Sequence, residues 1–151
     1  MADCSAPRKG RARGIQQWHN ALEGTKEARN GKGRGMGNPV VHFEIVSKEA
    51  GKLQSFYSEA FGWKIDADNA QGYGMVEAEG EGIGGGVANA PGDYPGHLTF
   101  YIQTDDLEGT LARIEELGGE TVMPPDSVGG GTTIAQFKDP GGNMVGLVKG
   151  M

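Results

Sequence analysis

The chain has 151 residues, which is the length of a single domain. Hydrophobic residues make up 36% and charged residues 23%, so there is enough apolar material for a core. The single cysteine, Cys4, excludes an internal disulfide framework and any metal site built from cysteines. No apolar run approaches the roughly 20 residues of a membrane-spanning helix. The formal net charge of -6 argues against a dedicated nucleic-acid binder.

Residues 1–35 differ in charge from the rest of the chain. They carry eight basic and three acidic residues, whereas residues 36–151 carry six basic and 17 acidic ones. Their only large apolar side chains are three: Ile15, Trp18 and Leu22. Because so little apolar surface cannot offset the entropy of the chain, we predict that residues 1–38 are a disordered basic extension. We favour an extension without a function, and a targeting peptide or a nucleic-acid-binding arm are the alternatives.

The rest of the chain begins with a strand and a helix. Residues 40–46 (VVHFEIV) alternate with the period of a strand, which places His42 and Glu44 on the face opposite the large apolar residues. Apolar residues then recur at helical spacing, at Leu53, Phe56, Tyr57, Ala60 and Phe61. We expect Ser47 to cap this helix and Gly62 to end it. Three short strands are predicted to follow, at residues 63–65, 73–77 and 83–87.

The same order of elements then recurs. Residues 97–103 (HLTFYIQ) also alternate, and one face of this predicted strand carries His97, Thr99 and Tyr101. The apolar positions of a second helix follow, at Leu107, Leu111, Ile114 and Leu117. Asp105 and Glu108 resemble a capping box, and Gly118 stops the helix. Three further strands are predicted at residues 120–123, 132–137 and 144–148, with the pair Pro124–Pro125 as a turn.

A strand–helix–strand–strand–strand unit therefore occurs twice. The offset between the two units is about 55 residues, as the positions of His42 and His97 show. We expect one domain over residues 39–151, made of modules at residues 39–89 and 96–151. One helix for every four strands leaves one sheet face uncovered, and its polar side chains predict a cavity wall. The expected fold is α+β, with two βαβββ modules that form a curved mixed sheet around a cavity.

This pattern resembles the vicinal oxygen chelate superfamily, which contains glyoxalases, bleomycin-resistance proteins and extradiol dioxygenases. The resemblance covers roughly residues 39–149 and rests on four motifs in a fixed order. They are a histidine in the first strand of each module, the Phe56–Tyr57 pair with AFGW ending at Trp63, LGG at residues 117–119, and DPGGN at residues 139–143. The resemblance implies a homodimer. Since no signal peptide or disulfide framework is present, we expect a cytoplasmic protein.

The resemblance also implies where a metal would bind. In metal-dependent members, the ligands come from the first and last strands of each module, and His42 and His97 occupy the two first-strand positions. Imidazole suits zinc, nickel or iron(II). The last-strand positions, where carboxylates are usual, fall on Gly146 and within residues 84–86, which are all glycines. Two of the four ligands are therefore missing, and Glu44, two residues after His42 on the same face, is the candidate for a substitute carboxylate.

Three functions follow from this incomplete ligand set. We expect a protein that binds a small organic molecule without a metal, in a cavity lined by His42, Glu44, His97, Thr99, Tyr101 and Gly146. The glycines would widen its floor. The alternative is a metal-dependent lyase, isomerase or dioxygenase that uses His42, His97 and a substitute carboxylate, with a zinc, nickel, manganese or iron ion and with Glu44 as the catalytic base. A third reading is a protein-contact module whose cavity is vestigial.

Overall fold

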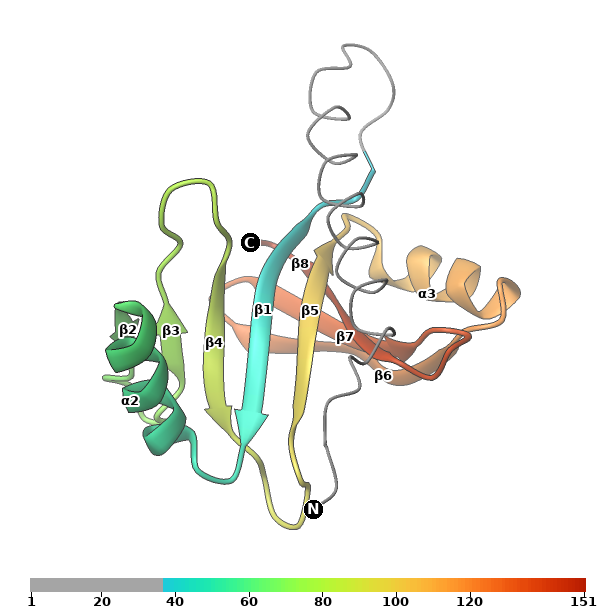
Figure 1. Ribbon diagram of the computed structural model, residues 1–151. Helices are drawn as coiled ribbons and strands as arrows, with labels where there is room; N and C mark the ends of the chain where they lie inside the picture. Colours follow the sequence, from blue (N-terminus) through green and yellow to red (C-terminus); the bar gives the residue numbers. More distant parts are fainter. Residues whose placement is uncertain (1–36) are drawn as a thin grey trace, which may run out of the picture. The chain divides into compact units, whose positions relative to one another are not determined.

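The computed structural model describes residues 37–151, so nearly all of the predicted basic extension lies outside the described residues. The described residues form one eight-stranded sheet in the order β2-β3-β4-β1-β5-β8-β7-β6 (Figure 1). The strands of the first module are β1 (Val40–Ser47), β2 (Ile65–Asp66), β3 (Gly74–Val76) and β4 (Gly84–Asn89). Those of the second module are β5 (His97–Gln103), β6 (Glu120–Gly129), β7 (Thr132–Lys138) and β8 (Met144–Lys149).

The two modules join at the centre of the sheet. β1 pairs with β5 in the antiparallel direction, while β4 and β8 flank this pair as parallel neighbours. The sheet curves without closing, so that β8, β7 and β6 pass behind β1 and β5 in Figure 1. This architecture confirms the predicted α+β fold with two repeated βαβββ units around a hollow.

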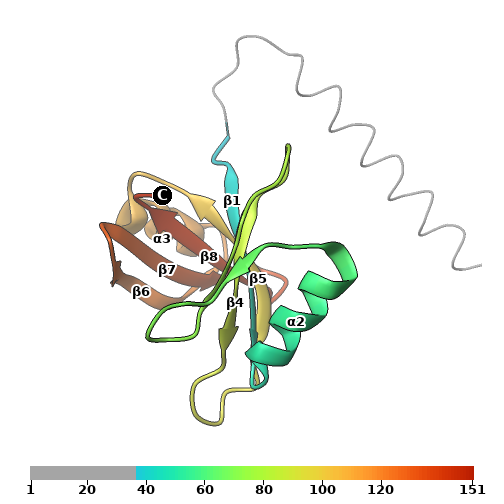
Figure 2. The same ribbon diagram turned by 90° about the vertical axis from the view of Figure 1, so that its left-hand side faces the viewer.

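Each module buries its own helix against the sheet. Helix α2 (Ala50–Phe61) covers a core that contains Val76 and Val87, and helix α3 (Leu107–Glu116) covers a core built around Leu147. Figure 2 shows the two helices at opposite ends of the sheet, with α2 in front and α3 behind β6–β8. No helix of the described residues is long and apolar enough to cross a membrane.

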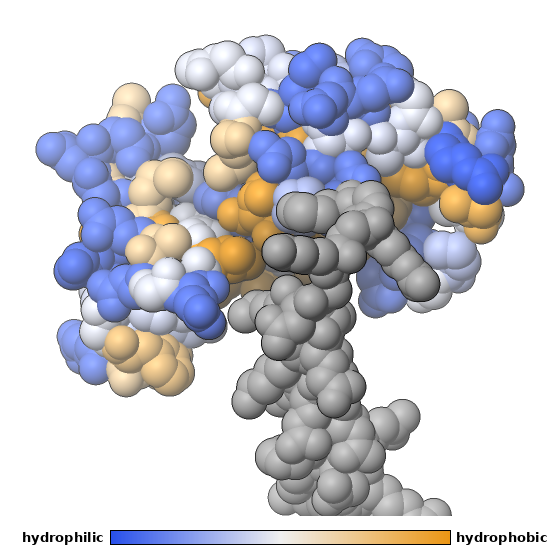
Figure 3. Space-filling model, turned by 90° about the horizontal axis from the view of Figure 1, so that it is seen from above, coloured by the Kyte–Doolittle hydropathy of each residue, from blue (hydrophilic) through white to orange (hydrophobic). Residues whose placement is uncertain are grey.

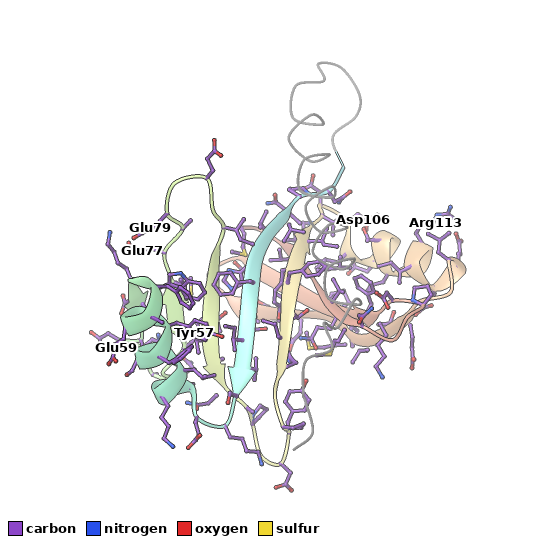
Figure 4. The ribbon with its side chains drawn as sticks, viewed as in Figure 1. Tyr57, Glu59, Glu77, Glu79, Asp106 and Arg113 are labelled. Atoms are coloured by element: carbon purple, nitrogen blue, oxygen red, sulfur yellow. The ribbon has the colours of Figure 1, made fainter. Side chains whose placement is uncertain are left out.

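The helix boundaries differ in part from those that the sequence predicts. Gly62 ends α2 in the left-handed conformation, with φ of 70°, as expected for a residue without a side chain. Ser47 is not the cap of α2, because Glu49 holds that position without a side-chain hydrogen bond. In α3 the cap is Asp106, whose Oδ1 accepts from the Gly109 amide at 3.0 Å, so the predicted capping box is wrong (Figure 4).

The prolines at 124 and 125 lie inside a strand and not at a turn. β6 continues through them to Gly129. Because β6 is the edge strand, a residue without an amide hydrogen can lie there without breaking a ladder on both sides. Its pairing with β7 shifts register between Met123 and Asp126, where the prolines lie. The longer strand matters for function, because its end lines the cavity described below.

Candidate functional site

A cavity of about 600 Å³ lies against the face of β1 that is turned away from α2. Seen from above, hydrophobic side chains gather in the hollow between the two lobes of the domain (Figure 3). Both modules contribute to the cavity lining, which consists of His42, Glu44, Gln71, Tyr73, Met75, Tyr101, Val128, Gly129, Thr132, Ile134, Val148 and Met151. Of the six predicted ligand-binding residues, His42, Glu44 and Tyr101 line it, while His97, Thr99 and Gly146 do not.

His42 is buried and paired with a tyrosine. Its side chain extends from β1, and its Nε2 lies 2.9 Å from the Tyr73 hydroxyl. Burial lowers the pKa of His42 below its ordinary value, and the negative charge of Glu44 offsets only part of this effect. His42 is therefore a neutral imidazole at neutral pH, and it acts as a hydrogen-bonding group and not as a cation.

Glu44 stands two residues further along the same face of β1. The Tyr101 hydroxyl donates to its Oε2 at 2.7 Å, and Nε2 of His97 lies 3.5 Å from the same oxygen. Burial, and then the charge of Glu44, raise the pKa values of both Tyr73 and Tyr101 well above their ordinary value. The two phenols therefore stay protonated, and they present hydroxyl donors around one carboxylate.

The resemblance implies that His42 and His97 would be ligands of one metal site, but the two histidines do not lie side by side. In the antiparallel ladder His42 is opposite Tyr101, whereas His97 is opposite Val46, four residues further along β1. At about 3.3 Å per residue, their Cα positions are offset by roughly 13 Å along the strands. Glu44 lies between them, and His97 turns its other nitrogen, Nδ1, to the Tyr94 hydroxyl at 2.7 Å.

Tyrosine side chains occupy the space beside two strand glycines, Gly86 in β4 of the first module and Gly146 in β8 of the second. A Cβ built on Gly146 would clash with the ring of Tyr101, and one built on Gly86 would clash with the hydroxyl end of Tyr73. The sequence suggested that these glycines widen the cavity floor. They instead make room for the two tyrosine side chains. Thr99 also has a structural contact in place of a cavity position, since its Oγ1 donates a hydrogen bond to the carbonyl oxygen of Met144 at 2.8 Å.

Sequence reasoning missed Tyr73 and Gln71. Tyr73 is predicted to begin a strand at residues 73–77, but β3 begins at Gly74. Both residues precede it in an irregular segment, where alternation does not determine which side chain faces the cavity. Asn69 holds this segment, because its side-chain oxygen accepts from the Tyr73 amide at 3.0 Å and its amide donates back to the Tyr73 carbonyl at 2.8 Å. The one available signal was the glycine run of β4, which leaves space that a large neighbour must fill.

The donor set does not fit the divalent metal that the family resemblance implies. His42 is bonded to Tyr73, and Glu44 is bonded to Tyr101. The ring of Tyr101 takes the space where a side chain at position 146 would reach. Among the described residues, no group of three or more His, Cys, Asp or Glu side chains is arranged to hold a metal ion. The residues instead form a hydrogen-bonded network of phenol, imidazole and carboxylate.

Comparison with known proteins agrees with the repeat and the fold. Residues 40–147 match the Glyoxalase/Bleomycin resistance protein/Dioxygenase superfamily, and the chain belongs to this family. It is 28% identical over 117 residues to the anthracycline biosynthesis protein DnrV of Streptomyces peucetius, a match that covers 66% of this chain and 42% of that protein. The chain thus spans about two fifths of the length of this curated relative.

Another relative matches over most of its own length. The probable lactoylglutathione lyase of Vibrio cholerae is 31% identical over 126 residues, which covers 73% of this chain and 89% of that protein. Among solved structures, methylmalonyl-CoA epimerase from Mycobacterium tuberculosis aligns with a TM-score of 0.59 at 15% identity, covering 82% of this chain and 95% of that chain. At such low identity the structural likeness shows the shared fold alone.

Proposed function

We propose that the protein binds a small organic molecule in the cavity without a metal ion. The observation that carries this proposal is the pairing of Tyr101 with Gly146 and of Tyr73 with Gly86. Each tyrosine fills space that a metal-ligating side chain would need, and its hydroxyl engages Glu44 or His42. The four side chains thus satisfy one another, and they present a polar wall for hydrogen bonding to a ligand.

The dimensions and lining of the cavity suit an organic ligand. A volume of about 600 Å³ falls within the roughly 300–1,000 Å³ of small-molecule sites. Apolar side chains from both modules face the polar wall, at Met75, Val128, Ile134 and Val148. Such a mixture, with much apolar surface and few polar groups, is typical of sites that bind a ligand by burial and orient it by hydrogen bonds. The relation to a protein of anthracycline biosynthesis is consistent with a ring-containing ligand.

A lyase is the second candidate, because the Vibrio cholerae relative is named a probable lactoylglutathione lyase. The family resemblance implies a divalent metal for such a lyase. Metal content separates the two candidates. We expect the full-length protein, incubated with nickel, zinc, manganese or iron(II) and then freed of excess ion, to retain far less than one metal per chain by plasma mass spectrometry. About one ion per chain, lost in both His42→Ala and His97→Ala, would overturn the metal-free proposal.

Ligand binding itself is tested by thermal stabilisation, since a compound that binds only the folded state raises the melting temperature. We expect aromatic compounds of drug size to stabilise the full-length protein. Val128→Trp, at an exposed position in the cavity lining, should abolish this shift. Val122→Trp is the matched control, because Val122 is also an exposed valine of β6 but does not line the cavity. Equal shifts in both variants would place the ligand elsewhere.

We also infer that the protein is a homodimer. Leu98 is 76% exposed and Phe100 is 41% exposed on β5, at the centre of the sheet and on the face that carries the helices. Apolar side chains gathered on a central strand are costly to leave in water, and a second copy of the chain would cover them. This interface is independent of the cavity, which lies on the other face of β5.

A further inference from the structure

Among the described residues that line the cavity, Glu44 has the only carboxylate side chain. The lining formed by the described residues contains no lysine and no arginine, and its other acidic or basic member is the imidazole of His42. The Glu44 side chain is only 14% exposed, so water screens its charge poorly. A carboxylate in this position requires compensation from its surroundings.

The neighbours of Glu44 supply dipoles, and His97 forms an ion pair with it only when the imidazole is protonated. Tyr101 donates one hydrogen bond at 2.7 Å and remains a neutral phenol. His42, whose pKa is lowered by burial, is also neutral. The Nε2 of His97 lies 3.5 Å from the Glu44 Oε2, which is the outer limit of a hydrogen bond. The other ring nitrogen of His97, Nδ1, is hydrogen-bonded to the Tyr94 hydroxyl. The carboxylate is therefore hydrogen-bonded, but no lysine or arginine of the described lining neutralises it.

The groups around Glu44 are those that recognise a cation on an apolar body. Tyr73 and Tyr101 both line the cavity beside this carboxylate, and their hydroxyl oxygens add partial negative charge next to it. Val128 and Ile134 offer apolar surface against which the rest of a ligand would pack. The excess of acidic over basic residues in positions 36–151 also attracts cations and repels anions.

We propose that the ligand of this cavity carries a protonated amine that pairs with Glu44, attached to an apolar or aromatic body that packs between the two modules. This inference rests on the proposed function and names the class of ligand. It predicts discrimination by charge: a hydrophobic amine should bind, a neutral analogue of the same shape should bind more weakly, and a carboxylate should be rejected.

Three compounds that share one ring system test this prediction: naphthylethylamine, naphthylethanol and naphthylacetate. Their affinities for the full-length protein are measured by isothermal titration calorimetry at neutral pH. We expect the amine to bind about tenfold more tightly than the alcohol, as a charge-assisted hydrogen bond would produce, and the acetate to bind more weakly than both. In Glu44→Gln the amine should lose its advantage, while the alcohol retains its affinity.

Glu59→Gln is the matched control. Glu59 is an exposed residue of α2 that points away from the sheet, and its substitution removes the same unit of charge outside the cavity (Figure 4). The amine should keep its advantage in this variant. Equal binding of all three compounds, or an advantage that survives in Glu44→Gln, overturns the amine inference but leaves the organic-ligand proposal standing. Binding of none of them to the wild-type protein would count against both.

Discussion

Tyr101 and Gly146 face each other on neighbouring strands, and they fit together because one of them has no side chain. The two residues are partners in the parallel ladder between β5 and β8, and a Cβ on Gly146 would overlap the tyrosine ring. The ring in turn places its hydroxyl 2.7 Å from Glu44. A glycine on one strand thus determines where a phenol and a carboxylate meet on the next two strands.

Gly146→Ala should therefore lower the free energy of unfolding by about 1–3 kcal/mol, the usual cost of overpacking a core, and displace Tyr101. Urea denaturation measures the first effect. Gly51→Ala is the control, because a Cβ on this helical glycine meets nothing within 4 Å. We expect that change to be neutral or stabilising by up to about 1 kcal/mol. Similar losses in both variants would contradict the fit described here.

His42 gives the stability of the fold a dependence on pH. Burial holds its pKa below the ordinary value of 6.5, so at lower pH the unfolded chain takes up a proton more readily than the folded one. The free energy of unfolding should fall as the pH drops below 6.5. In His42→Gln this loss should be smaller. Urea denaturation of both proteins between neutral pH and about pH 5 tests this, and parallel curves would contradict it.

Tyr101 should make the free energy of unfolding depend on pH in the alkaline range. Its folded-state pKa is raised above the ordinary value of 10.0, so its stabilising effect is complete below that pH and is lost as the pH rises further. Tyr101→Phe removes the hydrogen bond to Glu44 and should lower the free energy of unfolding by about 1.5–3 kcal/mol at neutral pH. The gap between wild type and variant should narrow above pH 10.0. A gap that stays constant through alkaline pH would argue against this role.

If the protein is a homodimer, one substitution in the proposed interface should convert it to a monomer. Leu98→Glu should dissociate the dimer in sedimentation equilibrium while leaving the cavity intact, because Leu98 is turned to the opposite face. Leu117→Glu is a suitable control, since Leu117 is 62% exposed but lies at the end of α3. A wild-type protein that is monomeric at all concentrations would refute the dimer directly.

Alternation along two strands was sufficient to predict which face of the sheet carries the site. His42, Glu44 and Tyr101 line the cavity as alternation indicated, because in a strand the side-chain direction depends on odd or even position, whereas His97 and Thr99 on the same predicted face do not line it. It could not predict the register between β1 and β5, and that register places Tyr101, and not His97, opposite His42. Local periodicity carries no information about pairing between distant segments.

Tyr73 illustrates a second limit. It lies outside any strand, and its contact with His42 joins residues 31 positions apart. Its position depends on the space left by Gly86 and on two hydrogen bonds with Asn69, one donated and one accepted by the Asn69 side chain, and these are features of the assembled fold. The extension of β6 through two prolines was missed for a related reason, because only an edge strand tolerates them and the sequence does not reveal which strand is at the edge.

The single antiparallel ladder between β1 and β5 is the seam along which the two modules meet. Cavity residues come from both sides of this seam, with Tyr73 and Met75 on one side and Ile134 and Val148 on the other. A molecule held in the cavity would therefore act as a non-covalent cross-link between two otherwise separately packed cores. Occupancy of the site should make the two halves of the domain unfold together, and amide hydrogens on both sides of the seam should exchange more slowly.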